Sequence, residues 1–403
     1  MRPADHATPP RAHRIALLFN GNKVFDRDVL RGIAAYLTST RSPWELFLEE
    51  DFRMRLAGIE HWQGDGIIAD FDDPAVAHAL SHSRIPVVAV GGSYADPKNY
   101  PAGVPYIATD NGKLVERAYD HLIEAGLRHF ALFSLPESPA NRWAQEREHA
   151  YAQLMQRDKL ATWMSRGHST SAPSWDAAVE HQVAWLRSLP KPVGIIAVTD
   201  ARARHLLQVC EHLNIPVPEK LSVIGIDNEE LTRYLSRVAL SSVVQGTRQM
   251  GYRAAKLLHQ LLDRRELPLQ RILVPPVKVV ERRSTDFRSL RDPAVIQAMH
   301  YIRYHACKGI KVEQVLDAIG MSRSNLEKRF KDETGQTIHG VIHEEKLDRA
   351  RNLLAATSIS INEISQMCGY PSLQYFYSVF KKGYEMTPKE YRSIHGDSVY
   401  QDV

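Results

Sequence analysis

The sequence predicts an α/β region of two lobes with parallel sheets, followed by an all-α region that contains two helix-turn-helix units. Three observations support this fold class. Short apolar runs alternate with helix-period stretches from Arg14 to about Thr285. These roughly 270 residues exceed what one hydrophobic core accommodates, which favours two lobes. Beyond Thr285 the strand pattern stops, and one helix–glycine–helix pattern occurs twice.

Composition and charge are those of an ordinary globular protein, with 403 residues, 44% hydrophobic residues and a net charge of +4. The charge alone does not indicate nucleic acid. Three widely spaced cysteines, Cys210, Cys307 and Cys368, indicate neither a disulfide framework nor a zinc site and fit a reducing cytoplasm. Residues 1–13 have no apolar run, so we expect a disordered tail and no signal peptide. No membrane-spanning run is present, and we expect a cytoplasmic protein.

The first predicted strand is the continuous apolar run at residues 15–19, which is typical of a strand buried on both faces. A stretch with helical spacing follows it at residues 26–37. Further runs predicted as strands occupy residues 66–69, 86–90, 130–133, 194–198 and 222–226. Further predicted helices include residues 115–125, 201–213 and 249–262. This alternation predicts parallel sheets with helices on both faces.

Polar residues follow these apolar runs, at the strand ends where open parallel sheets bind ligands. They include Asn20, Asp70, Tyr94, Asp200 and Asp227. Each of them taken singly is better explained by capping of a helix or a turn. Together they predict a binding edge where the two lobes face one another. Amides and carboxylates suit a neutral polyhydroxylated ligand, because each hydroxyl of such a ligand both donates and accepts a hydrogen bond.

Several stretches resemble the LacI-type effector domains, which are relatives of the periplasmic sugar-binding proteins. Residues 222–229, 231–235 and 239–245 resemble the signature of the second lobe, and residues 274–285 resemble the closing strand. Residues 147–151 resemble the family's Arg-x-x-Gly-aromatic motif, with Ala150 where the family prefers glycine. The sugar-sensing domain is therefore expected at residues 14–285. Only residues 1–13 precede it here, where the family carries its DNA-binding head, so we expect the DNA reader elsewhere.

The resemblance implies two periplasmic-binding-protein-like lobes, with three crossovers near Gly126, Gln245 and Pro275 and a sugar between the lobes. Lobe 1 would comprise about residues 14–127 and 246–275, and lobe 2 about residues 128–244 and 276–285. By position, Arg147, Asp227 and Gln245 match residues that make strong sugar contacts in the family. Trp175 matches an aromatic residue that stacks on the sugar. Asp200 and Asn20 match contacts of some members only. Tyr94 and Asp70 are added from their places at strand ends.

The C-terminal region begins with a predicted core helix at residues 292–304 and then repeats the helix-turn-helix pattern. Gly320 and Gly369 stand at the two turns, and Ser322 and Ser372 are the expected N-caps of the second helices. Each second helix has an inward pair four residues apart, ending at Phe330 and Phe380. The outward residues predicted to read bases are Ser324, Glu327, Lys328, Leu373, Gln374, Tyr377 and Ser378. These outward residues could instead form an ordinary charged face in contact with solvent. Because the same helix-turn-helix pattern recurs in the second unit, DNA recognition is the favoured interpretation.

A long helix at residues 338–355 joins the two units and is about 27 Å long at 1.5 Å per residue. The length of this helix together with the widths of the two units gives a separation that approaches the ~34 Å between successive major grooves on one face of double-stranded DNA. Residues 286–398 are assigned to this domain, and residues 292–393 resemble the AraC-type DNA-binding domain over essentially its whole length. Arg323, Lys382 and Arg392 are candidates for phosphate contacts by charge alone.

The combination of a LacI-type sensor with an AraC-type reader resembles the family of xylose-operon activators, as does the stretch at residues 195–205. The resemblance implies a D-xylose effector, allosteric activation of xylose catabolism and transport genes, a homodimer and contact with RNA polymerase. Another pentose, or an α/β region that serves only as a dimerisation platform, stays open as an alternative. An enzyme with an appended DNA domain is the third class. Phosphate-loop, His-Glu-x-x-His and nucleophile-elbow motifs are missing from the sequence, so we expect neither catalysis, nor a cofactor, nor a metal.

Overall fold

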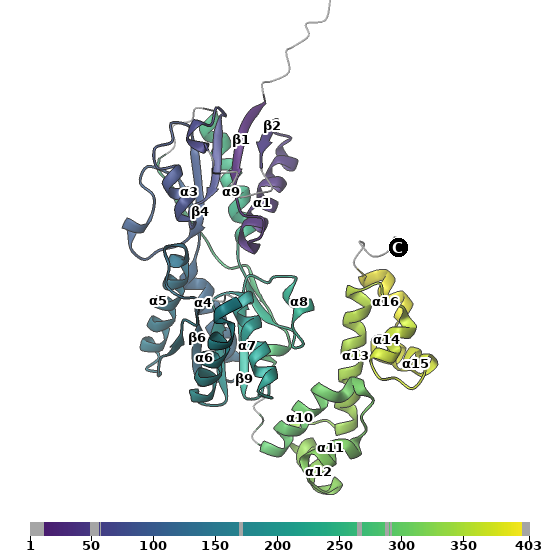
Figure 1. Ribbon diagram of the computed structural model, residues 1–403. Coiled ribbons are helices and arrows are strands. Elements are labelled where there is room, and N and C mark those ends of the chain that lie inside the picture. The colour runs from purple at the N-terminus through teal and green to yellow at the C-terminus, as the bar shows by residue number, and fades with distance from the viewer. Residues whose placement is uncertain are drawn as a thin grey trace, which may run out of the picture. The chain divides into compact units, whose positions relative to one another are not determined.

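The computed structural model describes residues 12–48, 56, 58–168, 172–263, 268–286, 290 and 292–396. The chain divides into two compact units, Met1–Phe287 and Arg288–Val403 (Figure 1). Residues 1–11 of the expected disordered tail lie outside the described residues. His13, which we also assigned to the tail, instead begins the first strand, because it is paired in parallel with Trp44.

The first lobe is built on a six-stranded parallel sheet with the order β11-β5-β4-β3-β1-β2. Its strands are β1 (His13–Leu18), β2 (Trp44–Phe47), β3 (Gly66–Asp70), β4 (Val87–Gly92), β5 (Tyr106–Thr109) and β11 (Arg271–Val274). Ile15 and Leu17 pack with α1 (Val24–Thr40) and α9 (Thr247–Leu262). The alternate residues Ala16 and Leu18 pack on the other face with α3 (Pro74–Ala79). Both faces are covered, which explains the continuous apolar runs.

Helices α1 and α9 come from distant parts of the chain and lie in close contact, as Figure 1 shows. A Cβ atom at Gly32 would lie 2.0 Å from the carbonyl oxygen of Arg248, and one at Gly251 would lie 2.0 Å from that of Val29. The two glycines therefore allow the helix backbones to approach closely. This contact fixes α9, which follows the second crossover, onto the first lobe.

The second lobe has a six-stranded sheet with the order β12-β10-β9-β8-β6-β7. Its strands are β6 (Phe130–Phe133), β7 (Trp163–Ser165), β8 (Val193–Ala197), β9 (Leu221–Ile226), β10 (Ser241–Val244) and β12 (Lys278–Val280). Its helices are α4 (Asn111–Glu124), α5 (Arg142–Arg157), α6 (Trp175–Ser188), α7 (Asp200–His212) and the short α8 (Thr232–Leu235). The sheet is parallel except for β12, which pairs antiparallel with β10.

The first crossover lies earlier than the sequence suggested. We expected it near Gly126, but α4 packs on β8, β9 and β10, and its Tyr119 and Leu122 share a core with Phe130. The chain therefore changes lobe between β5 and α4, near Asp110. An amphipathic helix does not reveal which of two sheets its apolar face covers. The other crossings run from β10 to α9 and from β11 to β12, at residues 245–246 and 275–277.

The second unit is all-α, as predicted. Its helices are α10 (Pro293–His305), α11 (Val312–Ile319), α12 (Arg323–Thr334), α13 (Ile338–Ala356), α14 (Ile361–Met367), α15 (Leu373–Tyr384) and α16 (Pro388–His395). A short 3-10 helix of this unit lies at Ala306–Lys308. In the first unit, short 3-10 helices lie at Ile59–His61, Pro97–Asn99, Pro139–Asn141, Ala172–Ser174 and Arg283–Thr285. Helix α13 serves both halves, since Val341 belongs to the core of the first and Leu354 to that of the second.

Both turns of the repeated pattern use a glycine with positive φ, 71° at Gly320 and 68° at Gly369, a conformation that residues with a Cβ atom rarely adopt. Two details differ from expectation. Ser322 occupies the N-cap position of α12, but its side chain makes no capping hydrogen bond, whereas Ser372 accepts one from Tyr375. The apolar spacing of residues 361, 364 and 367 predicts one buried face, but Met367 is 43% exposed and the adjacent Cys368 is buried instead.

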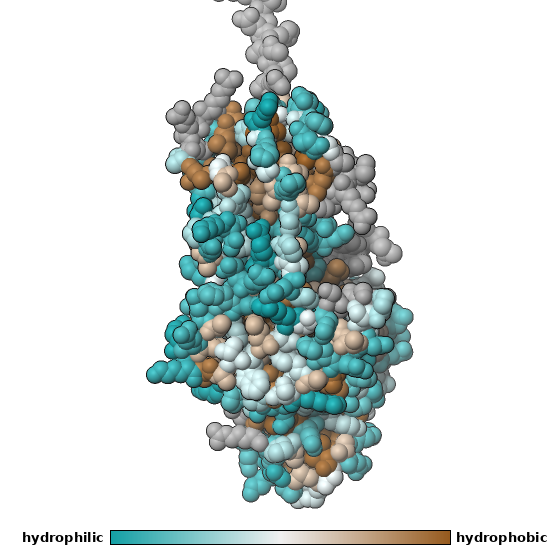
Figure 2. Space-filling model, turned by 60° about the vertical axis from the view of Figure 1, so that its left-hand side comes forward, coloured by the Kyte–Doolittle hydropathy of each residue, from teal (hydrophilic) through white to brown (hydrophobic). Residues whose placement is uncertain are grey.

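Exposed hydrophobic surface is concentrated on lobe 1 in the view of Figure 2, where the brown patches gather on the upper lobe. The lower lobe shows a mixture of hydrophilic and pale residues on that face. Large hydrophobic residues that are exposed in lobe 1 include Leu46, Leu269 and Leu273. Leu46 lies on β2 and Leu273 on β11, the two edge strands of the sheet, so this exposed apolar surface follows the sheet edges.

Candidate ligand-binding cluster and nucleic-acid interface

Arg147 on α5 is the centre of a buried polar network in the second lobe. Its Nε donates to Asn111 Oδ1 at 2.9 Å, its Nη2 donates to Gln245 Oε1 at 3.3 Å, and its Nη1 donates to the carbonyl of Val198. Gln245 in turn donates to Asp227 Oδ1 at 2.5 Å. The structure thus brings together the three residues that resemblance marked as strong sugar contacts.

Burial sets the protonation of this network. It lowers the pKa of Arg147 to about 10, while the charges of Asp227 and Asp72 act in the opposite direction. Burial also raises the pKa of Asp227 to about 7, and the charge of Asp200 adds to that shift. Asp227 has a φ of 127° and Asn228 a φ of 55°, a region that residues with side chains rarely occupy. Strained backbone of this kind is typical of functional loops.

The first lobe presents a cluster of carboxylates at its strand ends. Asp70 accepts from Lys23 Nζ at 2.9 Å and from the backbone N–H of Asp72 at 2.9 Å. Asp72 accepts from the N–H of Gly92 at 2.8 Å and from the Tyr94 hydroxyl. Burial and the charge of Asp70 raise the pKa of Asp72 to about 7. Tyr94 therefore holds a carboxylate in place.

The two clusters lie against each other. Asp72 of lobe 1 is close enough for its charge to act on Arg147 of lobe 2. A Cβ atom at Gly92 of lobe 1 would lie 2.8 Å from both the Cβ of Trp143 and the amide nitrogen of Asn111. An ion pair between Arg27 Nη2 and Glu229 Oε1, at 2.8 Å, also joins the lobes. A small ligand at this junction would contact side chains from both lobes.

Three other residues predicted to bind the sugar make contacts outside the Arg147 network. Asp200 is buried and accepts from Ser242 Oγ at 2.6 Å and from the Glu229 N–H at 2.7 Å, so it supports the loop after β9. Asn20 uses its amide oxygen to accept from the N–H of Asn22 at 3.0 Å. Trp175 begins α6, is 47% exposed and lies edge-on to His205 at 5.9 Å between ring centroids.

Asn111 and Asp72 were not predicted as site residues. Both carry a signal that could have found them, since Asn111 follows β5 and Asp72 follows β3 by two residues. Within the described residues, no group of three or more His, Cys, Asp or Glu is arranged to hold a metal ion. Among the helices of the described part of the chain, none combines the length and hydropathy of a membrane span.

Helices α12 and α15 stand in the recognition positions of the two helix-turn-helix units. Of the predicted base readers, Ser324 and Lys328 are exposed on α12, with Glu327 half-exposed. On α15 the exposed readers are Leu373, Gln374 and Ser378, with Tyr377 half-buried. Tyr375, which was not predicted, is also exposed. Both helices therefore present accessible side chains of the kinds that read base edges.

The phosphate candidates have different surroundings. Arg323 donates to Glu327 at 3.0 Å and to Glu313 at 3.2 Å, so carboxylates of its own unit already share its charge. Arg392 donates to the carbonyl of Ile359 at 2.5 Å and holds α16 against the start of α14. One donor of the Arg392 guanidinium is therefore used within the fold. Lys382 is exposed in the last turn of α15.

Comparison with known proteins matches each part of the chain. Three family models match stretches of the chain: the XylR N-terminal domain at residues 14–112, a periplasmic binding protein-like domain at residues 119–285 and a helix-turn-helix domain at residues 315–394. The chain is 65% identical to the xylose operon regulatory protein of Escherichia coli (strain K12) over 387 residues, 96% of this chain and 98% of that protein. The chain belongs to the xylose operon regulatory protein family.

A second family member, the xylose operon regulatory protein of Haemophilus influenzae, is 55% identical over 94% of this chain and 98% of its own length. A solved structure described as the xylose-binding transcription activator xylR superposes with a TM-score of 0.86, at 63% identity, and covers 96% of this chain and 100% of that one. The chain is therefore a transcription regulator with a sugar-sensor fold and a DNA-binding unit. The relatives are regulators and not enzymes.

Proposed function

We propose that this protein is a D-xylose-responsive transcription activator that binds the sugar between its lobes and reads double-stranded DNA through α12 and α15. The observation that carries the sugar site is the Arg147–Gln245–Asp227 network of lobe 2, which lies against Asp72 of lobe 1. Names of relatives support the choice of pentose, since those at 65% and 55% identity are both xylose operon regulatory proteins.

The chemistry of the network suits a neutral sugar. The guanidinium of Arg147 donates only, the carboxylate of Asp227 accepts when ionised, and the amides of Gln245 and Asn111 do both. A pentose hydroxyl can therefore replace one protein partner and satisfy another. Hydroxyl donors would stabilise the ionised form of Asp227, whose pKa burial has raised to about 7. Binding at a pH near 7 is thus coupled to proton release.

Sugar binding would favour the closed arrangement of the lobes, because only that arrangement offers hydroxyl contacts from both sides at once. A ligand shifts a conformational equilibrium only through such differential affinity. We further propose a homodimer in the cytoplasm, in which two chains present four helix-turn-helix units and contact RNA polymerase. Residues 14–285 would sense the sugar and residues 286–398 would bind DNA, using the exposed residues of α12 and α15 together with Lys382.

The test is calorimetric titration of the full chain with D-xylose, L-arabinose and D-ribose, for the wild type, Asp227→Ala and Glu180→Ala. Glu180 is an exposed residue of the same lobe and is the control. Loss of hydrogen bonds to a charged group, about 1.5–3 kcal/mol, should weaken D-xylose binding by roughly 10- to 150-fold in Asp227→Ala and leave Glu180→Ala unchanged. Operator binding by fluorescence anisotropy should tighten with D-xylose. A folded chain that binds DNA but gives no heat with any pentose would favour the dimerisation platform.

A further inference from the structure

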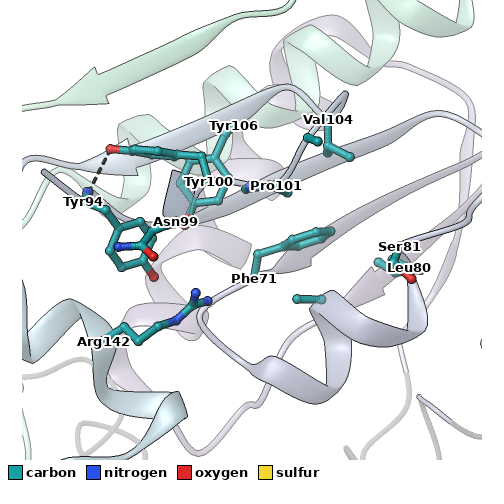
Figure 3. A pocket seen from close by; sticks show the side chains of 12 residues that line it. Phe71, Leu80, Ser81, Tyr94, Asn99, Tyr100, Pro101, Val104, Tyr106 and Arg142 are labelled. Atoms are coloured by element: carbon teal, nitrogen blue, oxygen red, sulfur yellow. Dashed lines mark hydrogen bonds between the residues drawn. The ribbon is translucent and has the colours of Figure 1, made fainter. Parts of the chain in front are cut away.

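A second pocket, distinct from the Arg147 network, opens in the first lobe between α3 and the loop that joins β4 to β5. It has a volume of about 320 Å³, at the small end of the range for ligand pockets. Figure 3 shows its wall of mainly aromatic and aliphatic side chains. The wall residues are Phe71, Leu80, Tyr94, Tyr100, Val104 and Tyr106.

The aromatic wall is rigidly held. The hydroxyl of Tyr100 accepts from the backbone N–H of Tyr94 at 2.8 Å, and the hydroxyl of Tyr106 donates to the carbonyl of Gly92 at 3.2 Å. Tyr100 contacts both other tyrosine rings edge-on, with ring centroids 5.4 Å and 5.1 Å apart. Three tyrosines therefore present fixed ring surface to the pocket, while the hydroxyl groups of Tyr94 and Tyr106 donate to Asp72 and to the carbonyl of Gly92.

Arg142 supplies the only cation among the residues that line this pocket. It is the first residue of α5, in lobe 2, and its guanidinium lies over the ring of Tyr94 at 5.3 Å. Figure 3 shows the guanidinium directed toward the pocket beside Phe71. In the described part of the chain this half-buried group makes no hydrogen bond and no ion pair. A guanidinium has five donors in a fork that matches a carboxylate.

We infer that this pocket binds a small carboxylate with an aromatic or compact apolar body. The carboxylate would pair with Arg142, and the body would pack against the tyrosines and Phe71. Burial of the body removes apolar surface from water, and the ion pair forms at the edge of an apolar wall, where its strength exceeds that of a fully exposed pair. A neutral sugar is a poorer match than a carboxylate with an apolar body, since the wall is mainly apolar and the hydroxyl groups of Tyr94 and Tyr106 already donate to protein acceptors.

The pocket shares Tyr94 with the lobe junction. One side of this residue faces the pocket, and its hydroxyl donates to Asp72, the carboxylate that lies near Arg147. The pocket wall comes from lobe 1 and Arg142 comes from lobe 2, so an occupied pocket favours the closed arrangement. If D-xylose also favours closure, as proposed above, each ligand should tighten the binding of the other. The coupling rests on the proposed function, whereas the binding of the carboxylate does not.

Binding is tested first without sugar, by titrating the full chain with benzoate and detecting contact by saturation-transfer NMR. Benzyl alcohol is the uncharged probe of similar shape. Arg142→Gln should weaken benzoate binding at least about tenfold, because it removes a charge-assisted bidentate pair. The matched control is Arg271→Gln, since Arg271 also stacks on a tyrosine, at 4.7 Å from Tyr100, but does not line the pocket.

A second variant distinguishes loss of the pocket from loss of folding. Ala102→Trp places a large side chain into the pocket from an exposed loop position and should abolish benzoate binding while the melting temperature is retained. Benzoate affinity that is the same in the wild type, Arg142→Gln and Ala102→Trp would overturn the proposal. Equal affinity for benzyl alcohol, or no contact with benzoate at millimolar concentration, would overturn it as well.

Coupling is then measured as the Kd of D-xylose with and without saturating benzoate. We expect a decrease of roughly fivefold in the wild type and none in Arg142→Gln, within the usual range of coupling between sites. An unchanged Kd in the wild type would refute the coupling. Benzoate binding that depends on Arg142 in a chain that gives no response to D-xylose would support the pocket and count against the sugar site.

Discussion

The ion pair between Arg27 and Glu229 provides a direct test of lobe closure. Arg27 lies on α1 in lobe 1, Glu229 follows β9 in lobe 2, and their side chains are 34% and 18% exposed. A partly exposed pair of this kind contributes about 0.2–1 kcal/mol. Because it joins the two lobes, it stabilises only the arrangement in which they are in contact, which is the closed arrangement of the proposed function. Arg27→Gln should therefore shift the closure equilibrium by that amount.

The expected result is a weakening of D-xylose binding by up to about fivefold, since 1.36 kcal/mol corresponds to a factor of ten. The assay is calorimetric titration of wild type, Arg27→Gln, Glu229→Gln and the double variant at low and at high salt. The double variant should bind D-xylose as each single variant does, because either change alone removes the whole interaction. Added salt should reduce the difference from the wild type.

A matched control lies on the same helix. Arg31 pairs with Asp28 at 2.7 Å, and both residues belong to lobe 1. Arg31→Gln removes an ion pair of similar type that does not join the lobes, so D-xylose affinity should not change. The reasoning is refuted if Arg31→Gln and Arg27→Gln weaken binding equally, or if the effects of Arg27→Gln and Glu229→Gln simply add in the double variant.

Three further predictions concern stability and DNA. Gly32→Ala should lower the free energy of unfolding by about 1–3 kcal/mol in a urea titration, because its Cβ would collide with α9, whereas Gly21→Ala, with open space around it, should not. Burial and the charge of Asp70 raise the pKa of Asp26 to about 8, so the folded chain keeps a proton that the unfolded chain releases. Stability should then fall as pH rises from about 4 to about 8, by up to about 1.4 kcal/mol per pH unit, and this slope should be smaller in Asp26→Asn. An equal slope in both proteins would contradict the assignment. In anisotropy measurements, Lys382→Gln should weaken binding to all DNA sequences and reduce the salt slope by about one, whereas Gln374→Ala should cost about 1–3 kcal/mol at its own base pair only.

Much of the fold was accessible from the sequence, because central strands and amphipathic helices carry periodic signals. The runs that became β1, β3, β4, β6, β8 and β9 are central strands, buried on both faces. Strands β2 and β7 were not predicted, because each lies at a sheet edge and is only partly buried. The central strands β5 and β10 were not predicted either, because each is only four residues long and includes hydroxyl side chains. An edge strand has no continuous apolar run, so nothing local distinguishes it from a loop.

The candidate site was accessible only in part. The polar residues at strand ends indicated where a ligand could bind, and resemblance singled out Arg147, Asp227 and Gln245. Local pattern could not show that Asp200 supports a loop with both of its carboxylate oxygens, or that Arg392 bonds to a backbone carbonyl. Both roles depend on partners about 30 to 40 residues away in the chain, such as Ser242 for Asp200 and Ile359 for Arg392.

The sequence by itself determined the local elements and their order: apolar runs that must be covered on both faces, and two helix pairs whose turns need a glycine at positive φ. These follow from side-chain periodicity and backbone sterics, which act over a few residues. Tertiary structure alone decided that α4 belongs to the second lobe and that Asp72 lies near Arg147. It also placed Arg142 over a pocket of the opposite lobe. Such contacts join residues far apart in the chain, and only the packing of the two sheets against their helices determines which of them meet.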